Sequence, residues 1–160
     1  MSDPDNLSLK HRVFRYVFLS IAKITRGMTL GVRAVVLDEQ NRVFLVRHTY
    51  VPGWSLPGGG VEVGETFVTS LGRELEEEGN IVLEGAPQLH GIFFNIAGRR
   101  RDHVAIYVVR AFRQTAPRPG DAEIAETGFF ALDALPASTT RATRQRLAEV
   151  LEGAPITAHW

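Results

Sequence analysis

Apolar residues recur along this chain at two spacings, and the spacing predicts the type of each element. Runs rich in β-branched and aromatic residues are typical of strands. Such strands are predicted at residues 29–37, 42–47, 86–95, 103–113 and 128–131. The first two are joined by Asp38 to Asn41, a polar turn of the composition that closes hairpins. The near-continuous apolar run of residues 103–113 indicates burial on both faces.

Apolar residues three or four positions apart indicate helices elsewhere. Helices are predicted at residues 7–25, 66–79 and 140–151. In the second, Phe67, Leu71 and Leu75 form a narrow apolar stripe that needs a core to face. Since several strands are linked by hairpin-like loops rather than by helical crossovers, a mixed sheet between helices is favoured over a doubly wound parallel sheet.

Composition narrows the function classes. The 160 residues suit one globular unit, and 18 basic against 18 acidic residues give no strong signal for nucleic-acid binding. The absence of cysteine excludes disulfides, thiolate zinc sites and a cysteine nucleophile, and it accords with the cytoplasmic location that we expect. The polar start of the chain does not resemble a secretory signal, and no segment has the roughly 20 apolar residues of a transmembrane helix.

Candidate chemistry is concentrated in residues 58–81, where a glycine-rich turn precedes the second predicted helix. Helical spacing places Glu74, Glu77 and Glu78 on one face, and such like charges destabilise a helix unless a partner compensates them. A divalent cation is the natural partner, because Mg²⁺ prefers oxygen ligands and is commonly held by a few carboxylates together with substrate phosphates. The turn lets the backbone approach closely, so the Gly59 carbonyl is a further candidate ligand.

Residues 59–81 fit the pattern G-x(5)-E-x(7)-R-E-U-x-E-E-x-G-U, where U is aliphatic, and they closely resemble the Nudix box. One position departs, since Asn80 replaces the last glycine; asparagine is the next most accepting residue for the left-handed helix end expected there. The resemblance implies an α/β fold, a Nudix-like α/β/α sandwich with a mixed β-sheet. It divides the chain into an N-terminal amphipathic helical extension (1–26) and a Nudix hydrolase domain (27–160).

The resemblance also implies an activity, the Mg²⁺-dependent cleavage of the pyrophosphate linkage in a nucleoside diphosphate joined to another moiety, with Mn²⁺ as a substitute metal. Glu74, Glu77 and Glu78 would hold the metal, and Glu74 or a loop carboxylate would position or deprotonate the attacking water. Glu123 is the preferred loop carboxylate by similarity to the family. Glu65 and Arg73 would brace the turn on the helix.

The residues that contact the substrate are less constrained by the sequence. Cationic and aromatic side chains can bind phosphate and stack on a base. The candidates for substrate binding are Arg47, Trp54 and Arg101, with His48, Tyr50, Arg99 and Arg100 as further ones. For each, a surface or rim-packing role is an equal alternative.

Other functions stay open at this point. A non-catalytic Nudix-fold module could bind a nucleotide or regulate a partner, although a binder has little need for three clustered glutamates. An isoprenoid diphosphate isomerase is disfavoured by the missing cysteine. The basic amphipathic segment 7–25 could dock a membrane or a partner, but packing on its own domain or in a homodimer is favoured.

Overall fold

A computed structural model of the chain describes residues 27–96 and 102–160. The elements are β1 (Thr29–Val36), β2 (Val43–His48), β3 (Trp54–Ser55), β4 (Gly58–Gly60), α2 (Phe67–Gly79), β5 (Ile81–Leu83), β6 (Gln88–Asn95), β7 (Asp102–Val109), β8 (Phe112–Gln114), β9 (Ile124–Phe130), the 3₁₀ turn η1 (Leu132–Ala134) and α3 (Arg141–Leu151). The predicted N-terminal helix of residues 7–25 lies outside the described residues.

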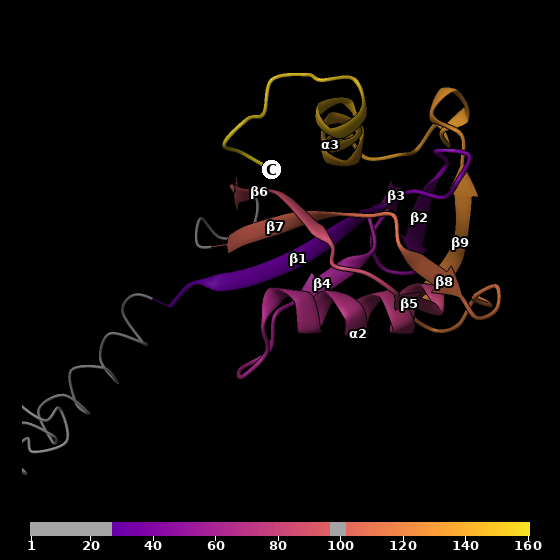
Figure 1. Ribbon diagram of the computed structural model, residues 1–160, viewed down its shortest axis with the longest axis horizontal. Helices are drawn as coiled ribbons and strands as arrows, with labels where there is room; N and C mark the ends of the chain where they lie inside the picture. Colours follow the sequence, from indigo (N-terminus) through magenta and orange to yellow (C-terminus); the bar gives the residue numbers. More distant parts are fainter. Residues whose placement is uncertain (1–26, 97–101) are drawn as a thin grey trace, which may run out of the picture.

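The central sheet has the order β4-β1-β7-β6, in which β1 and β7 are parallel and the other pairs are antiparallel. Three further strands form a second sheet in the order β3-β2-β9, and β5 pairs with β8. Helix α2 covers one face of the central sheet and α3 covers the other (Figure 1). The predicted α/β/α sandwich with a mixed sheet is therefore confirmed.

Two apolar clusters hold these layers together. The first joins Leu71 and Leu75 of α2 to Val32 and Ala34 of β1, all without exposed surface. The second places Leu147 of α3 against the opposite face of the sheet. Alternate residues of β1 thus face different helices, which explains why residues 34–36 of this strand are all apolar.

The turn between the first two strands reverses the chain as expected but does not close a hairpin. Asp38 Oδ1 accepts hydrogen bonds from the backbone N–H groups of Gln40 and Arg42 at 3.0 and 2.8 Å. Only one bridge, between Leu37 and Val43, follows, after which β1 pairs with β4 and β7 while β2 pairs with β3 and β9. The hairpin prediction was wrong because turn residues encode the reversal, whereas burial selects the pairing partners.

Other element boundaries also differ from the prediction. The apolar run of residues 103–113 is divided into β7 and β8, and β9 begins at Ile124 rather than near residue 128. The sequence pattern missed β5 and β4, and β4 consists of the three glycines 58–60. Glycine is a poor strand former, so this strand exists because β1 pairs with it.

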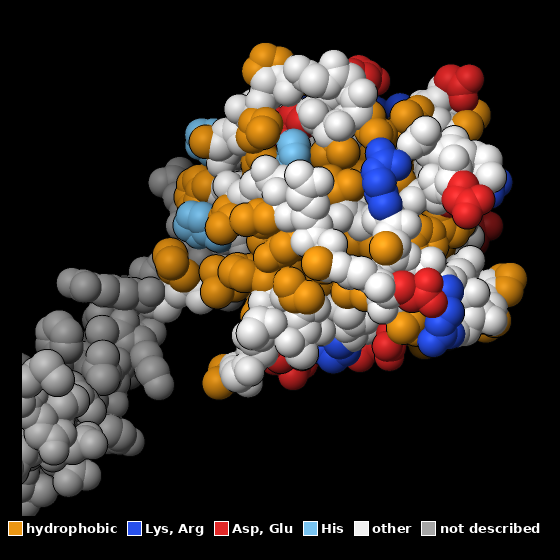
Figure 2. All heavy atoms as spheres, in the orientation of Figure 1, with side chains coloured by type: hydrophobic (Ala, Val, Ile, Leu, Met, Phe, Trp, Pro, Cys, Tyr) orange, Lys and Arg blue, Asp and Glu red, His pale blue; other side chains and the backbone are white. Residues whose placement is uncertain are grey.

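One side of the sheet keeps apolar residues uncovered by the part of the chain that the structure describes. Figure 2 shows hydrophobic side chains gathered over β6 and β7, and Leu30, Leu89 and Ile92 are 41–53% exposed. The segment predicted to form a homodimer contact, residues 7–25, lies outside the described residues. Neither described helix is long and apolar enough to cross a membrane.

Candidate functional site

Helix α2 presents the acidic residues because its ends are well defined. The Thr66 side chain caps its start by accepting a hydrogen bond from the Thr69 N–H at 3.1 Å. Asn80 ends it in the left-handed conformation (φ 53°, ψ 34°), and its N–H bonds to the Glu76 carbonyl at 3.0 Å. The position therefore has the backbone for which glycine is usual, and asparagine accepts it as predicted.

Arg73 braces the turn before the helix against the helix itself. Its Nε and Nη2 donate to the two carboxylate oxygens of Glu65 at 2.9 and 3.1 Å, and Nη2 also donates to the Gly60 carbonyl. The hydrogen bonds from Arg73 lower the pKa of Glu65 to about 2. This bidentate pair fixes the glycine strand beside α2, which is the bracing role expected from the spacing.

Glu78 is the most buried of the three candidate metal ligands. One carboxylate oxygen accepts the Gly58 N–H at 2.7 Å, and the other lies 3.2 Å from His48 Nε2. Glu74 is partly buried, and its carboxylate lies directly over Gly59, so that a Cβ built there would stand 2.5 Å from Oε1. Burial raises the pKa of Glu74. Glu77 is far more open, with 60% of its side chain exposed.

The three glutamates are not assembled around one point. Within residues 27–96 and 102–160, no three histidine or acidic side chains are grouped closely enough to hold a metal ion. Arg73 Nη1 instead lies 2.8 Å from Glu74 and 3.4 Å from Glu77. The carboxylates of Glu74 and Glu77 are thus close enough to contact the same cationic group. Carboxylate oxygens are the ligands that Mg²⁺ prefers, so the chemistry of these residues fits a hard divalent cation.

A cavity of about 320 Å³ brings Glu74 and Glu78 together with a residue far along the chain. Glu123, in the loop before β9, lines this cavity and accepts a hydrogen bond from Tyr50 Oη at 3.3 Å. The Tyr50 ring lies 5.3 Å from that of His48, between centroids. The structure therefore brings the predicted loop carboxylate to the same cavity as two of the helix carboxylates.

Arg33 on β1 is a cavity residue that the sequence reasoning missed. Its Nη1 donates to the Leu56 carbonyl at 2.5 Å, and burial lowers the pKa of its guanidinium, which nonetheless stays charged. The sequence does contain a signal for this role, because Arg33 is the single charged residue in the otherwise uncharged strand TLGVRAVV. A partly buried guanidinium on the wall of a cavity can pair with a phosphate oxygen.

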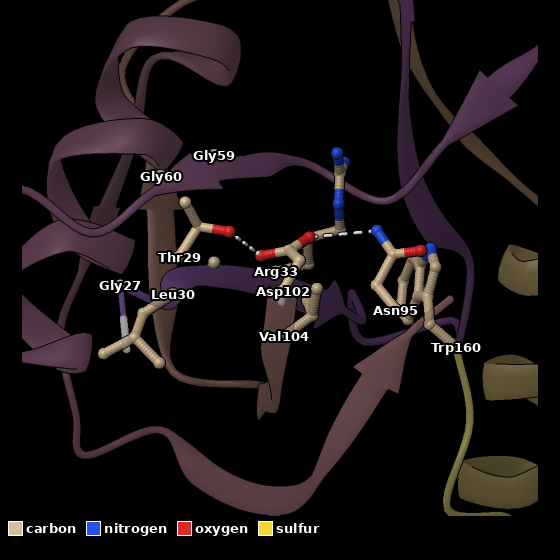
Figure 3. A pocket seen from close by; sticks show the side chains of 11 residues that line it. Gly27, Thr29, Leu30, Arg33, Gly59, Gly60, Asn95, Asp102, Val104 and Trp160 are labelled. Atoms are coloured by element: carbon tan, nitrogen blue, oxygen red, sulfur yellow. Dashed lines mark hydrogen bonds between the residues drawn. The ribbon is translucent and has the colours of Figure 1, made fainter. Parts of the chain in front are cut away.

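A second cavity, of about 570 Å³, meets the first at Arg33, Gly59 and Gly60. Figure 3 shows the side chains around it, with Trp160 beside Asn95. Its polar wall is a row in which Thr29 Oγ1 and Asn95 Nδ2 donate to the two oxygens of Asp102 at 3.0 and 2.9 Å. The first cavity is thus lined mainly by charged side chains. The second combines an aromatic ring with hydrogen-bonding groups.

Two of the predicted substrate-binding residues have structural contacts instead. Arg47 Nη2 pairs with Glu126 at 2.6 Å. Trp54 is only 9% exposed and packs edge-on against Phe130, with 4.8 Å between ring centroids. Neither residue lines the two cavities. The strand register of the second sheet, which no local pattern encodes, turns both away from the site, and Arg101 lies outside the described residues.

Comparison with known proteins agrees with this geometry. The family model described as NUDIX domain matches residues 27–151. Among curated relatives, an RNA pyrophosphohydrolase of Pelagibacter ubique (strain HTCC1062) is 38% identical over 65 residues, which are 39% of this chain and 41% of that protein. A protein named putative 8-oxo-dGTP diphosphatase, from Bacillus subtilis (strain 168), is 42% identical over 50 residues, covering 31% and 34%. The chain thus spans about two fifths or less of these relatives' length.

Among solved structures, the MutT NUDIX hydrolase from Burkholderia pseudomallei superposes with a TM-score of 0.67 at 32% identity, over 76% of this chain and 97% of that one.

Proposed function

The chain belongs to the Nudix family, and we propose that it is a metal-dependent hydrolase that cleaves the pyrophosphate linkage of a nucleoside diphosphate joined to another moiety. One observation carries the proposal. Glu74, Glu78 and Glu123, which lie up to 49 positions apart in the sequence, line one cavity together with the partly buried cation Arg33. Carboxylates that can hold a metal and a cation that can pair with a phosphate, in one cavity, suit the hydrolysis of a phosphoanhydride.

We assign the metal to Glu74, Glu77 and Glu78, with the Gly59 carbonyl as a further ligand. When bound, Mg²⁺, or Mn²⁺ in its place, would neutralise adjacent phosphates and lower the pKa of a water molecule. Arg73, which contacts Glu74 and Glu77, would then keep its bidentate bond with Glu65 and continue to hold the turn.

The protein's own residues bind and orient the reactants. Arg33 would pair with the phosphate nearest the junction of the two cavities, because it lines both of them. Glu123 would accept the proton of the attacking water, with Tyr50 holding its carboxylate in position. Glu74 is the alternative base, since it lines the same cavity as Glu123.

The second cavity would take the nucleoside part of the substrate. Its size and its mixture of an aromatic ring with hydrogen-bonding groups suit a planar heterocycle, and its junction with the acidic cavity lies where a diphosphate would cross. The relatives named for RNA and for 8-oxo-dGTP also act on nucleotide-derived molecules, which supports this substrate class.

A substrate panel with product identification by mass tests the proposal. The full chain is incubated with Mg²⁺ or Mn²⁺ and nucleoside triphosphates, nucleoside diphosphate sugars, dinucleoside polyphosphates, 8-oxo-dGTP or 5′-triphosphorylated RNA. Glu77→Gln keeps the side chain's shape and removes its charge, so turnover should fall by about 10²-fold or more. Glu76→Gln, an exposed neighbour on the same helix, is the matched control and should retain activity.

Two outcomes would overturn the proposal. Undiminished turnover by Glu77→Gln would remove the metal-ligand assignment. Binding of nucleotides without release of any product, under either metal, would instead favour the non-catalytic module.

A further inference from the structure

The segment of residues 154–160 follows α3, and its last three residues lie along the outer edge of β6. Phe94 N–H donates to the Ala158 carbonyl at 2.9 Å, and Trp160 N–H donates to the Phe94 carbonyl at 3.0 Å. His159 makes a parallel bridge with Phe94. This short addition to the sheet carries the Trp160 ring to the wall of the second cavity (Figure 3).

A buried arginine on α3 holds this segment. The side chain of Arg146 has no exposed surface, and its guanidinium carbon lies 3.9 Å from the Phe93 ring centroid and 5.9 Å from that of Trp160. Its Nη1 donates to the His159 carbonyl at 3.2 Å, and Nη2 donates to Thr157 Oγ1 at 2.9 Å. The planar fork therefore binds the segment at two points while its face stacks under the aromatic rings.

Glu149 completes the arrangement from the next turn of α3. One of its oxygens accepts from Arg146 Nη2 at 2.7 Å and from the Thr157 N–H at 3.2 Å, and the other lies 3.1 Å from His90 Nε2. Burying the charges of Arg146 and Glu149 costs desolvation free energy. Two apolar side chains of similar volume would avoid that cost, so stability alone does not account for this ion pair. Its bonds instead define where the segment lies.

The position of Trp160 matters because of what faces it. Arg33, which joins the two cavities, lies 5.9 Å from its ring. The hydrogen-bonded row begins at Asn95, which lies beside Trp160 (Figure 3), and continues through Asp102 to Thr29. A planar heterocycle can thus be stacked on one side and hydrogen-bonded at its edge, with its phosphates directed towards Arg33.

We propose that Trp160 is the stacking surface for the heterocyclic part of the substrate, and that Arg146 is a positioning residue that acts through it. The inference rests on the proposed function in that it names the recognition of the non-phosphate part of the same substrate. It makes the C-terminal segment a determinant of specificity, whereas the glutamates determine turnover.

Binding without chemistry gives the first test. Nucleoside 5′-monophosphates (AMP, GMP, CMP and UMP) are titrated into the full chain without metal, and the dissociation constants are measured by calorimetry. Trp160→Ala should weaken the tightest-binding of them roughly tenfold, since stacking on an aromatic ring is worth that order per base. Trp160→Phe should restore most of the affinity. Ile156→Ala, an exposed residue of the same segment, is the matched control and should bind as the wild type does.

The positioning role has its own readout. Arg146→Lys keeps the charge opposite Glu149 but loses the fork and the stacked face. It should weaken monophosphate binding at least threefold and increase hydrogen exchange in residues 154–160 under conditions where the fold is retained. With any substrate that is hydrolysed, Trp160→Ala and Arg146→Lys should raise KM while kcat changes less than twofold.

Wild-type affinity in Trp160→Ala, or an equal loss in Ile156→Ala, would overturn the inference whether or not Arg146→Lys folds. Hydrolysis with an unchanged KM in Trp160→Ala would sink this inference and leave the proposed hydrolase standing. If monophosphate binding depends on Trp160 but the chain hydrolyses none of the substrates, this inference stands and the proposed hydrolase activity is wrong.

Discussion

Three adjacent glycines allow the placement of Glu74 to be tested by adding a single methyl group. In Gly59→Ala the new Cβ would stand 2.5 Å from Glu74 Oε1 and 2.7 Å from its Cδ. Real Cβ atoms essentially never approach other atoms that closely, and ordinary contact begins at 3.4 Å. The Glu74 carboxylate must therefore retreat by about 1 Å from its place over the strand.

Gly59→Ala is expected to lower the activity of the protein much more than its stability. Gly59 does not have the positive φ of its neighbour Gly58, so alanine can adopt its backbone conformation. Restricting the unfolded chain then offsets much of the strain, and the free energy of unfolding should change by no more than about 1 kcal/mol. A displacement of about 1 Å in a catalytic group lowers turnover about 10²-fold, which corresponds to about 2.7 kcal/mol in the activation barrier.

The assay measures kcat on the best substrate of the panel and the unfolding midpoint in urea. Gly60→Ala is the neighbouring comparison, because its Cβ would meet no atom within 4 Å, and it should lose far less activity. Gly58→Ala should behave differently from both. Its Cβ would clash with the Val32 carbonyl oxygen of the paired strand at a φ of 133°, so it should destabilise the fold by roughly 3 kcal/mol or more.

Either of two results would contradict this prediction. Retention of more than half of the wild-type kcat in Gly59→Ala would mean that Glu74 is not needed where it lies. A loss of stability in Gly59→Ala as large as that in Gly58→Ala would attribute the lost activity to a damaged strand.

Three further predictions concern the metal, the helix end and the loop before β9. Chelation by EDTA should abolish turnover and added Mg²⁺ should restore it; full turnover in EDTA would contradict the metal assignment. Asn80→Ala should lower the free energy of unfolding by about 1 kcal/mol, because alanine is strained at a φ of 53°, whereas Asn80→Gly should be nearly neutral by urea unfolding. Backbone N–H groups of Ile124 and Glu123 together with Arg118 lower the pKa of Asp121 to about 2 from its ordinary 3.8. Its stabilising contribution is therefore fully present above pH 3.8 and is lost as the pH falls through 2, so the difference in unfolding midpoint between wild type and Asp121→Asn should shrink over that interval; a constant difference would be contrary evidence.

Local patterns accounted for the helix that carries the acidic residues. The faces of a helix follow from a period of 3.6 residues, so the spacing alone separated Leu71 and Leu75 from the glutamates. The same reasoning anticipated the Glu65–Arg73 pair and the left-handed Asn80, since each depends on residues within about two helical turns. Thr140 likewise starts α3 at the predicted position, with its side chain accepting from the Thr143 N–H.

Contacts between distant segments were beyond such reasoning. The parallel pairing of β1 with β7 joins residues about 73 positions apart, and it places Thr29 opposite Asp102 in the second cavity. The pairing of β2 with β3 placed Trp54 in the core, which is the packing alternative that the sequence left open for it.

The amino-acid sequence by itself determined the family, because the motif of residues 59–81 is continuous in the chain. It also determined the acidic helix and the bracing of its turn, because these depend on interactions between residues close along the chain. Only the tertiary structure decided that Arg33, Glu123 and Trp160 share the two cavities with that helix. The physical reason is that strand register and burial compete over the whole molecule. A short stretch of sequence predicts neither of them, so the residues that contact a given side chain are known only from the assembled sheets.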